Sequence, residues 1–131
     1  MKRAAINPWA WQERLGFAQA VDVTAAQRVL YCSGQTAVNA DGAPQHAGDL
    51  RGQLGAAIAN LRTVLETAGL GFGNVVRLTV YTTDVQGLVA HWDAVMAPFR
   101  EAGSPPASTL LGVARLARPE FLVELEATAV A

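Results

Sequence analysis

The stretch Ser104–Ala131, SPPASTLLGVARLARPEFLVELEATAVA, decides the fold, because it predicts two extended strands joined by a turn. Consecutive side chains of a strand point to opposite faces, and the end of this stretch alternates clearly. Its two faces are Phe121, Val123, Leu125, Ala127 and Ala129 on one side, and Leu122, Glu124, Glu126 and Thr128 on the other. The first face predicts core. The second places two carboxylates roughly 6.6 Å apart, since a strand rises about 3.3 Å per residue, which is close enough to couple their titrations or share a water.

The segments upstream of this stretch predict a β hairpin, a helix, a strand and a second helix. Residues 15–23 alternate like a half-buried strand and are expected to pair with residues 28–33, after which residues 35–38 extend further. Apolar residues three and four apart then predict a helix that Asp49 caps and Gly69 ends. Residues 74–83 return to a strand. Asp84 caps a second helix, which Pro98 bends in its last turn and which ends before Gly103.

Each predicted helix has a single apolar stripe, which places both helices side by side on one face of a mostly antiparallel sheet. The expected fold class is therefore a two-layer α+β domain. Beside the two glutamates, the other face of the sheet would carry the side chains of Tyr31, Thr79, Tyr81, Leu111, Val113 and Leu122. That face is too apolar to meet water, and a partner subunit is its simplest cover.

The composition favours one domain over residues 1–131 and excludes several classes of partner. Hydrophobic residues make up 51% of the 131 residues, enough to bury a core. The net charge is -1 and the arginines are scattered singly, so no basic stripe could follow a phosphate backbone and no nucleic-acid partner is expected. No continuous apolar run predicts a signal peptide or a membrane span. Cys32 is the only cysteine, which agrees with a reducing compartment, and the cytoplasm is the expected location.

The sequence also argues against a bound cofactor or metal. Lys2 is the only lysine and lies in a terminal segment, where a stable Schiff base to pyridoxal phosphate is not expected. No Walker loop or dinucleotide fingerprint is present. His46 and His91 are far apart and have no cysteine or carboxylate at ligand spacing, so no metal site is predicted. Ser33 precedes Gly34 but lacks the glycine pattern of a hydrolase nucleophile elbow.

A set of short motifs in a fixed order extends over nearly the whole chain from Gly16 onward. These motifs are Ser33-Gly34-Gln35, Asp41-Gly42, Gly48-Asp49, Gln53, Asn60-Leu61, Leu65, Ala68-Gly69, Val75-Val76, Tyr81, Asp84, Pro106-Ala107, Val113-Ala114-Arg115-Leu116 and Val123-Glu124-Leu125-Glu126-Ala127. The pattern resembles the YjgF/RidA family. The resemblance implies a chorismate-mutase-like fold, a homotrimer and ligand clefts between subunits. It also implies hydrolysis of reactive enamines and imines to ketones and ammonia, without cofactor or metal.

Residue by residue, the resemblance carries over only in part. Gly34, Gln35 and Glu124 match the family pattern, and Glu124 would be the catalytic residue. Ser108 stands where deaminases of the family have an arginine that grips the substrate carboxylate. Three further cleft positions also differ: Phe17 replaces a tyrosine, Trp92 an asparagine and Leu110 a cysteine.

No other arginine is an obvious replacement for the missing one. Arg115 is seven residues from Ser108, so in a regular strand it faces the other side and cannot stand in within the same subunit. Arg14 or Arg28 of a neighbouring subunit remains an open alternative for the missing arginine. Losing such a clamp costs a few kcal/mol, or roughly two to three decades of affinity. Weak or absent activity on substrates like 2-aminoacrylate is therefore expected.

Three functions remain open at this point. The first is cofactor-free hydrolysis of another enamine or imine, in which Glu124, tuned by Glu126, handles a water while Ser108 and the backbone of residues 110–112 hold the substrate. Phe17, Tyr81 and Trp92 would then favour a larger apolar or aromatic ligand. The second is a non-catalytic trimer that binds small molecules or acts like a chaperone. The third is RNA cleavage, against which stands the lack of basic patches and of a histidine pair.

Overall fold

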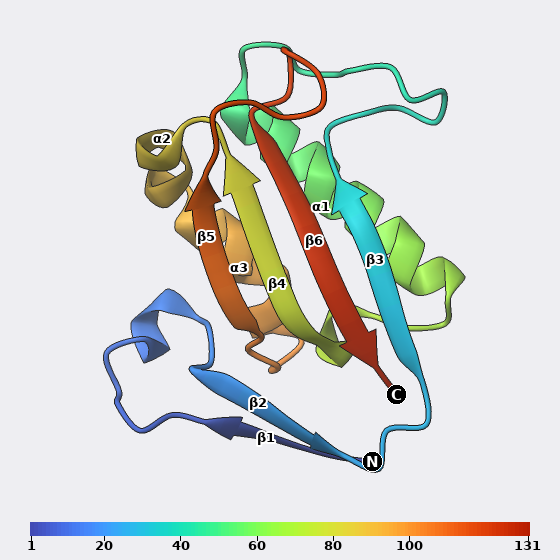
Figure 1. Cartoon of the computed structure of the whole chain (residues 1–131), viewed down its shortest axis with the longest axis vertical. Coiled ribbons are helices and arrows are strands. Elements are labelled where there is room, and N and C mark those ends of the chain that lie inside the picture. The colour runs from blue at the N-terminus through green and yellow to red at the C-terminus, as the bar shows by residue number, and fades with distance from the viewer.

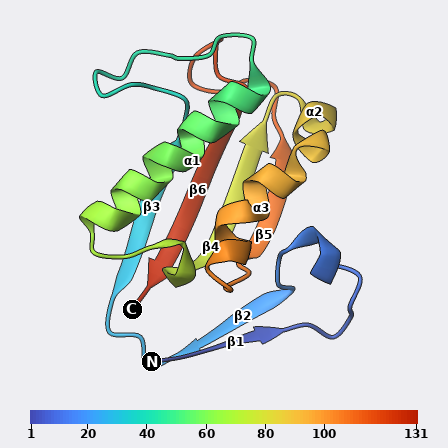
Figure 2. The same cartoon turned by 180° about the vertical axis from the view of Figure 1, so that it is seen from behind.

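The computed structural model describes all 131 residues, which fold into a four-stranded sheet, a separate two-stranded hairpin and three α-helices. In chain order the elements are β1 (Lys2–Ile6), the 3-10 turn η1 (Glu13–Leu15), β2 (Ala20–Thr24), β3 (Val29–Gln35), α1 (Leu50–Thr67), the 3-10 turn η2 (Phe72–Asn74), β4 (Val75–Thr82), α2 (Val85–Ala90), α3 (Trp92–Glu101), β5 (Ala107–Gly112) and β6 (Val123–Val130). The large sheet has the order β3-β6-β4-β5. Figure 1 shows this sheet face-on, and Figure 2 shows α1 and α3 covering its opposite face.

The alternation predicted for the last strand is confirmed in β6. Its inward residues Val123, Leu125, Ala127 and Ala129, and Phe121 just before the strand, are all 7% exposed or less. Glu124 and Glu126 lie on the other face, which the helices leave open. β6 occupies the centre of the sheet, between β3 and β4, and burying each Val or Leu side chain there contributes roughly 1.5–3 kcal/mol.

The two strands of the stretch 104–131 are not neighbours, because β4 lies between them. β5 pairs with β4 in parallel, and residues 113–122 lead from the end of β5 to the start of β6 as a loop rather than a tight turn. The parallel pair arises because α2 and α3 form the crossover connection from β4 to β5. The other two pairings, β3 with β6 and β4 with β6, are antiparallel. A mostly antiparallel α+β sheet is thus confirmed.

The predicted hairpin between residues 15–23 and 28–33 is wrong. β2 pairs with β1, and β3 pairs with β6. Residues 2–6 were missed because the sequence Lys-Arg-Ala-Ala-Ile does not alternate between apolar and polar residues. β3 pairs with β6 because that register sets Leu30 against Ala129 and Cys32 against Ala127 at the core. The β1–β2 hairpin is tied to the rest of the fold by Arg3, whose guanidinium donates to the carbonyls of Gly73 (2.7 Å) and Pro105 (3.1 Å).

The first predicted helix is confirmed at both ends. The Asp49 carboxylate caps α1 by accepting a hydrogen bond from the Gly52 amide at 3.0 Å. Gly69 follows the helix with φ of 75°, in the left-handed region that favours glycine. Leu54, Leu61 and Leu65 point into the core and are at most 1% exposed.

The second predicted helix is two helices. Asp84 caps α2 as expected, with its carboxylate accepting from the Gly87 amide. The chain then leaves the helical conformation at His91 (φ −110°, ψ 17°), which ends α2 and begins α3. Pro98 lies inside α3, as predicted. None of the helices has the length and apolar content needed to cross a membrane.

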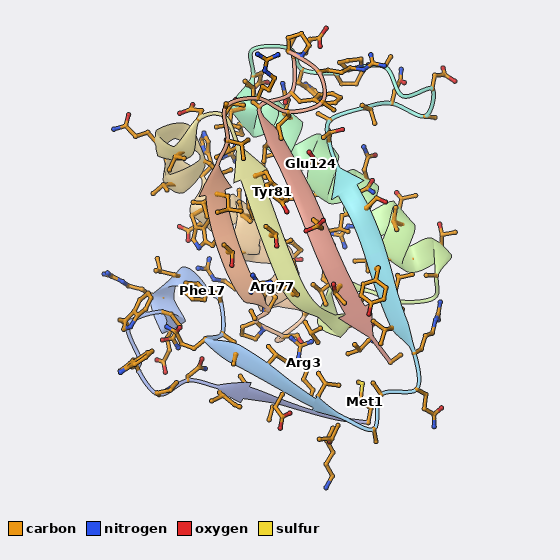
Figure 3. All side chains as sticks on the ribbon, viewed as in Figure 1. Met1, Arg3, Phe17, Arg77, Tyr81 and Glu124 are labelled. Carbon is orange, nitrogen blue, oxygen red and sulfur yellow. The ribbon has the colours of Figure 1, made fainter.

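The face of the sheet opposite the helices is uncovered in the single chain. Figure 3 shows Arg77, Tyr81 and Glu124 on this face. Tyr31 is 80% exposed there, and Leu111 is 43% exposed. We call this surface the open face.

Candidate functional site

The predicted site residues fall into two groups on opposite faces of the sheet. On the open face, Tyr81 of β4 is directly opposite Glu124 of β6. Ser108 and Leu110 of β5 are opposite Leu78 and Val80, which are core residues under the helices. Phe17 and Trp92 lie with Ser108 and Leu110, around one cavity. Within one chain, the structure therefore does not bring the second group to Glu124.

Glu124 is half-buried on the open face, above a glycine that makes room for it. A Cβ added at Gly34 would collide with the Glu124 carboxylate, lying 2.6 Å from its Cδ. Gly34 belongs to β3, where the pairing with β6 is irregular between Cys32 and Gln35. Its φ is not in the left-handed region, so the backbone does not require a glycine. The carboxylate is what requires one.

The charge of Glu124 is disfavoured where it lies. Burial raises the pKa of the Glu124 carboxyl, and the nearby charge of Glu126 raises it further. Glu126 itself accepts a hydrogen bond from the Tyr81 hydroxyl at 3.1 Å. That hydrogen bond, followed by burial, raises the pKa of Tyr81 and keeps the phenol protonated. The trio thus consists of one proton donor and two carboxylates, of which Glu124 holds a proton more readily than an ordinary glutamate.

A polar hollow of about 400 Å³ opens beside this trio. Its lining comprises Tyr81, Glu124 and Glu126 from the strands, and Val113, Arg115, Leu116 and Ala117 from the loop after β5. Arg115 makes no ion pair there. Sequence reasoning assigned no site role to Arg115, Leu116 or Ala117, although Arg115 and Leu116 belong to the motif that precedes β6.

The second group lines an apolar cavity of about 320 Å³ between β5, η1 and the helices. Its lining comprises Leu15, Phe17, Val89, Trp92, Ser108 and Leu110. The indole N–H of Trp92 donates to the carbonyl of Leu15 at 2.7 Å, which fixes the ring as one wall. Phe17 also contacts Trp11 in an edge-to-face arrangement, with ring centroids 5.9 Å apart. The sequence analysis missed Leu15 and Val89; Val89 lies in α2 and Trp92 at the start of α3, so no single helical spacing relates them.

Gln35 belongs to neither group. It is paired with Leu125, which points to the core, and its side-chain amide donates to the carbonyl of Ser33 at 3.1 Å. Its predicted role in substrate binding finds no geometric support within the chain. No group of three or more histidine, cysteine, aspartate or glutamate side chains is arranged to hold a metal ion.

With both clusters located, the chain can be compared with known proteins. A model of the family described as Endoribonuclease L-PSP matches residues 11–131. A crystal structure of YyfB, a member of the conserved Rid protein family from Yersinia pestis, matches with a TM-score of 0.88 and 38% identity, covering 100% of both chains. The chain belongs to the YjgF/RidA family.

Curated relatives agree with this assignment. Protein DfrA of Myxococcus xanthus is 34% identical over 131 residues, which span 99% of this chain and 97% of that protein. The 2-iminobutanoate/2-iminopropanoate deaminase of Mus musculus is 33% identical over 127 residues, or 97% of this chain and 84% of that protein. The family resemblance read from the motifs is thus confirmed, and with it the fold class.

Two motif residues of this YjgF/RidA chain hold the open-face group in position. The buried side chain of Gln53 in α1 donates to the carbonyl of Glu120 and accepts from the amide of Leu122, each at 2.8 Å, just before β6 begins. Asn60 of the same helix donates to the carbonyls of Thr36 and Val38, just after β3 ends. The helix therefore fixes both the loop leading to Glu124 and the segment following Gly34.

Proposed function

We propose that the protein is a cofactor-free hydrolase of a reactive enamine or imine other than 2-aminoacrylate, acting at clefts between the subunits of a homotrimer. One observation carries the proposal. The carboxylates are on the open face, and the cavity at Ser108 is beyond the sheet's edge under the helices. A ligand can contact both groups only if a second copy of the chain brings its cavity to the open face of the first. The exposure of Tyr31 and Leu111 supports such a contact.

Glu124 would supply the acid–base chemistry. Its charged form would take a proton from a water as the water oxygen bonds to the imine carbon and the C=N π electrons move to nitrogen. The resulting carboxylic acid would return that proton to nitrogen and give a neutral carbinolamine. The regenerated carboxylate would then take the proton of the new hydroxyl group and pass it to nitrogen as the C–N bond breaks, so that ammonia leaves and a carbonyl remains. A raised pKa suits both steps, because a general acid–base group works best when its pKa is close to the pH at which the enzyme operates. Burial raises the pKa of Glu124, and the charge of Glu126, which is bound to Tyr81, raises it further.

The relatives support this chemistry without fixing the substrate. The mouse relative is named for deaminating 2-iminobutanoate and 2-iminopropanoate. In this chain Ser108 provides no cation for such a carboxylate, and the cavity around it is apolar. The reaction class is therefore proposed to be shared, while the substrate differs.

Ammonia release from freshly generated imines tests the proposal. Oxidases acting on amines and amino acids supply small and aromatic imines, and the added protein should accelerate ammonia formation from at least one of them. Glu124→Gln keeps the size of the side chain and should abolish that acceleration. Glu66→Gln, on the exposed side of α1, is the matched control and should leave the rate unchanged. Equal rates for Glu124→Gln and the parent protein would overturn the role given to Glu124.

The assembly is tested separately by sedimentation velocity at micromolar concentration. A trimer of about 41 kDa is expected from the 13.8 kDa chain, whereas a stable monomer would remove the cleft on which the mechanism depends. The second candidate function is a non-catalytic trimer that binds a small molecule. It is favoured by the cavity at Ser108, where the serine hydroxyl is the only free polar side-chain group and could bind a ligand without reacting with it. Ligand binding without any imine turnover would support it.

A further inference from the structure

We propose that the cavity at Ser108 takes an uncharged, apolar group, so that the substrate is an imine derived from an amine without an α-carboxylate. That this ligand is turned over as a substrate rests on the proposed hydrolase function. The preference for an uncharged ligand rests on the cavity alone.

The hydrogen-bonding capacity of the cavity is the first step. Five of its six lining residues are hydrophobic. The indole N–H of Trp92 is already used by the carbonyl of Leu15. The Ser108 hydroxyl is buried and has no hydrogen-bond partner in the chain. The lining side chains therefore offer a ligand one hydrogen bond, which suits one neutral polar atom at the end of an apolar group.

Charge is the second step. No lining residue is charged. Arg100 lies against Gly16, next to Phe17 in the chain, but its guanidinium is bound to Asp93 at 3.1 Å and donates to the Arg14 carbonyl at 2.9 Å. A carboxylate in the cavity would lose its water and gain no cation, which is strongly unfavourable. The cavity therefore selects against anionic ligands.

The side of the proposed cleft that carries Glu124 and Glu126 also disfavours an anionic ligand. Glu124 and Glu126 already repel each other, as the raised pKa of Glu124 indicates. A substrate carboxylate would add a third negative charge, whereas a protonated imine would reduce the repulsion. Arg77, also on the open face, donates a hydrogen bond to the Thr109 hydroxyl at 2.6 Å. Arg115, which lines the hollow, is the cation there that makes no hydrogen bond or ion pair within the chain. It is exposed, where solvent weakens such an attraction, and we therefore make it an arm of the test.

Size is the last step. The cavity volume of about 320 Å³ is roughly twice that of a protein cavity of about 150 Å³ that binds benzene. The cavity, which Phe17 and Trp92 both line, is therefore large enough for a six-membered ring or a branched aliphatic chain. Such imines arise when a primary amine loses two electrons and two protons to an oxidase or dehydrogenase. Addition of water then gives an aldehyde or ketone and ammonia, with no further redox step.

Two aromatic ketones test the inference without requiring turnover. Acetophenone and phenylglyoxylate share a phenyl ring and a carbonyl, and differ in a methyl group against a carboxylate. Isothermal titration calorimetry at pH 7.5 should give acetophenone at least tenfold tighter binding. Ser108→Ala should weaken acetophenone several-fold through loss of one hydrogen bond. Ser108→Arg should make phenylglyoxylate the tighter ligand of the two. Thr63→Arg places the same charge on the exposed side of α1 and should leave acetophenone the tighter ligand.

Each outcome decides the inference. Tighter binding of phenylglyoxylate by the parent protein would overturn it, and loss of that binding in Arg115→Ala would identify the cation responsible. Failure of both ketones to bind would overturn it as well. Selective binding of acetophenone would support it even if no imine is hydrolysed, in which case only the proposed function fails. If Ser108→Arg does not fold, the comparison of the parent protein with Ser108→Ala still decides.

Discussion

Replacing Gly34 by alanine should leave the fold nearly as stable as before while removing the proposed activity. The new Cβ would lie 2.6 Å from the Cδ of Glu124 and 2.8 Å from its Cγ, whereas ordinary contacts begin at 3.4 Å. The carboxyl carbon must therefore move by at least about 0.8 Å, and the carboxylate oxygen, which is the atom nearest the new Cβ, must move further. A flexible side chain does so by turning off its preferred rotamer at a cost of about 0.5–1.5 kcal/mol. Because the φ of Gly34 is not in the left-handed region, alanine adds no backbone strain.

The effect on catalysis should be much larger. A misplacement of about 1 Å in a reacting group can cost roughly 10²-fold in rate, so imine hydrolysis should fall by about that factor. Displacing the carboxylate toward solvent should also lower the pKa of Glu124, since burial is the main cause of its elevation. Thermal unfolding, ammonia release and an NMR titration of the Glu124 carboxyl measure the three quantities. Gly55→Ala is the control, because nothing lies within 4 Å of its new Cβ.

Two results would refute this reasoning. Unchanged turnover in Gly34→Ala would mean that the position of Glu124 does not matter to the reaction. A loss of more than about 3 kcal/mol in stability would exceed the usual range of overpacking and would mean that the glycine serves the backbone instead. The double variant Gly34→Ala/Glu124→Ala distinguishes these cases. If the collision with Glu124 is the cause, Gly34→Ala lowers the stability of the parent protein but not that of Glu124→Ala.

Glu126→Gln should move the acidic limb of the pH–rate profile to lower pH, because the charge of Glu126 raises the pKa of Glu124; an unmoved limb would assign that limb to another group. Glu124→Gln should raise the midpoint of thermal unfolding at pH 7.5. A carboxyl whose pKa is higher in the folded chain destabilises it once ionised, so the gain should shrink as the pH falls and vanish below about pH 4.5, the ordinary value; a gain that persists at pH 3 would contradict this. Gln53→Leu should lower the unfolding free energy in urea by about 2–4 kcal/mol, because the Leu122 amide and the Glu120 carbonyl each lose a partner, whereas Gln86→Leu, at an exposed glutamine of α2, should have little effect.

Local patterns predicted the elements of this fold well, but not all of its strand pairings. The alternation around Glu124 and the spacing of leucines after Asp49 each reflect burial on one face, which the sequence records directly. The partner of β2 could not be found this way, because residues 2–6 do not alternate between polar and apolar and four of the five are exposed. They are held by backbone pairing with β2 and by the hydrogen bonds of Arg3 to distant carbonyls. Such long-range contacts leave no period in the sequence.

The separation of the candidate site into two groups on opposite faces of the sheet could, by contrast, have been predicted from the sequence. Leu110 and Leu111 are consecutive residues of one strand and must point to opposite faces. Leu111 had been assigned to the open face, so Leu110 and Ser108 belonged to the other one. Phe17 and Trp92 could not be placed by such counting, since one lies after the 3-10 turn η1 and the other at the start of α3. Only the tertiary structure brings them to Ser108.

This division also bears on whether the chain has kept a catalytic function. Gly34 and Glu124 each carry a cost to the stability of the isolated chain. The glycine increases the entropy of the unfolded state, and the carboxylate is held where its charge is disfavoured. A binding protein would gain stability from alanine at position 34 together with an uncharged residue at 124, as expected wherever no function demands strain. Changes around Ser108 alter an apolar cavity on the other face and leave this pair untouched. The arrangement is therefore the one that the proposed function requires, in which the ligand differs while the acid–base group stays in place.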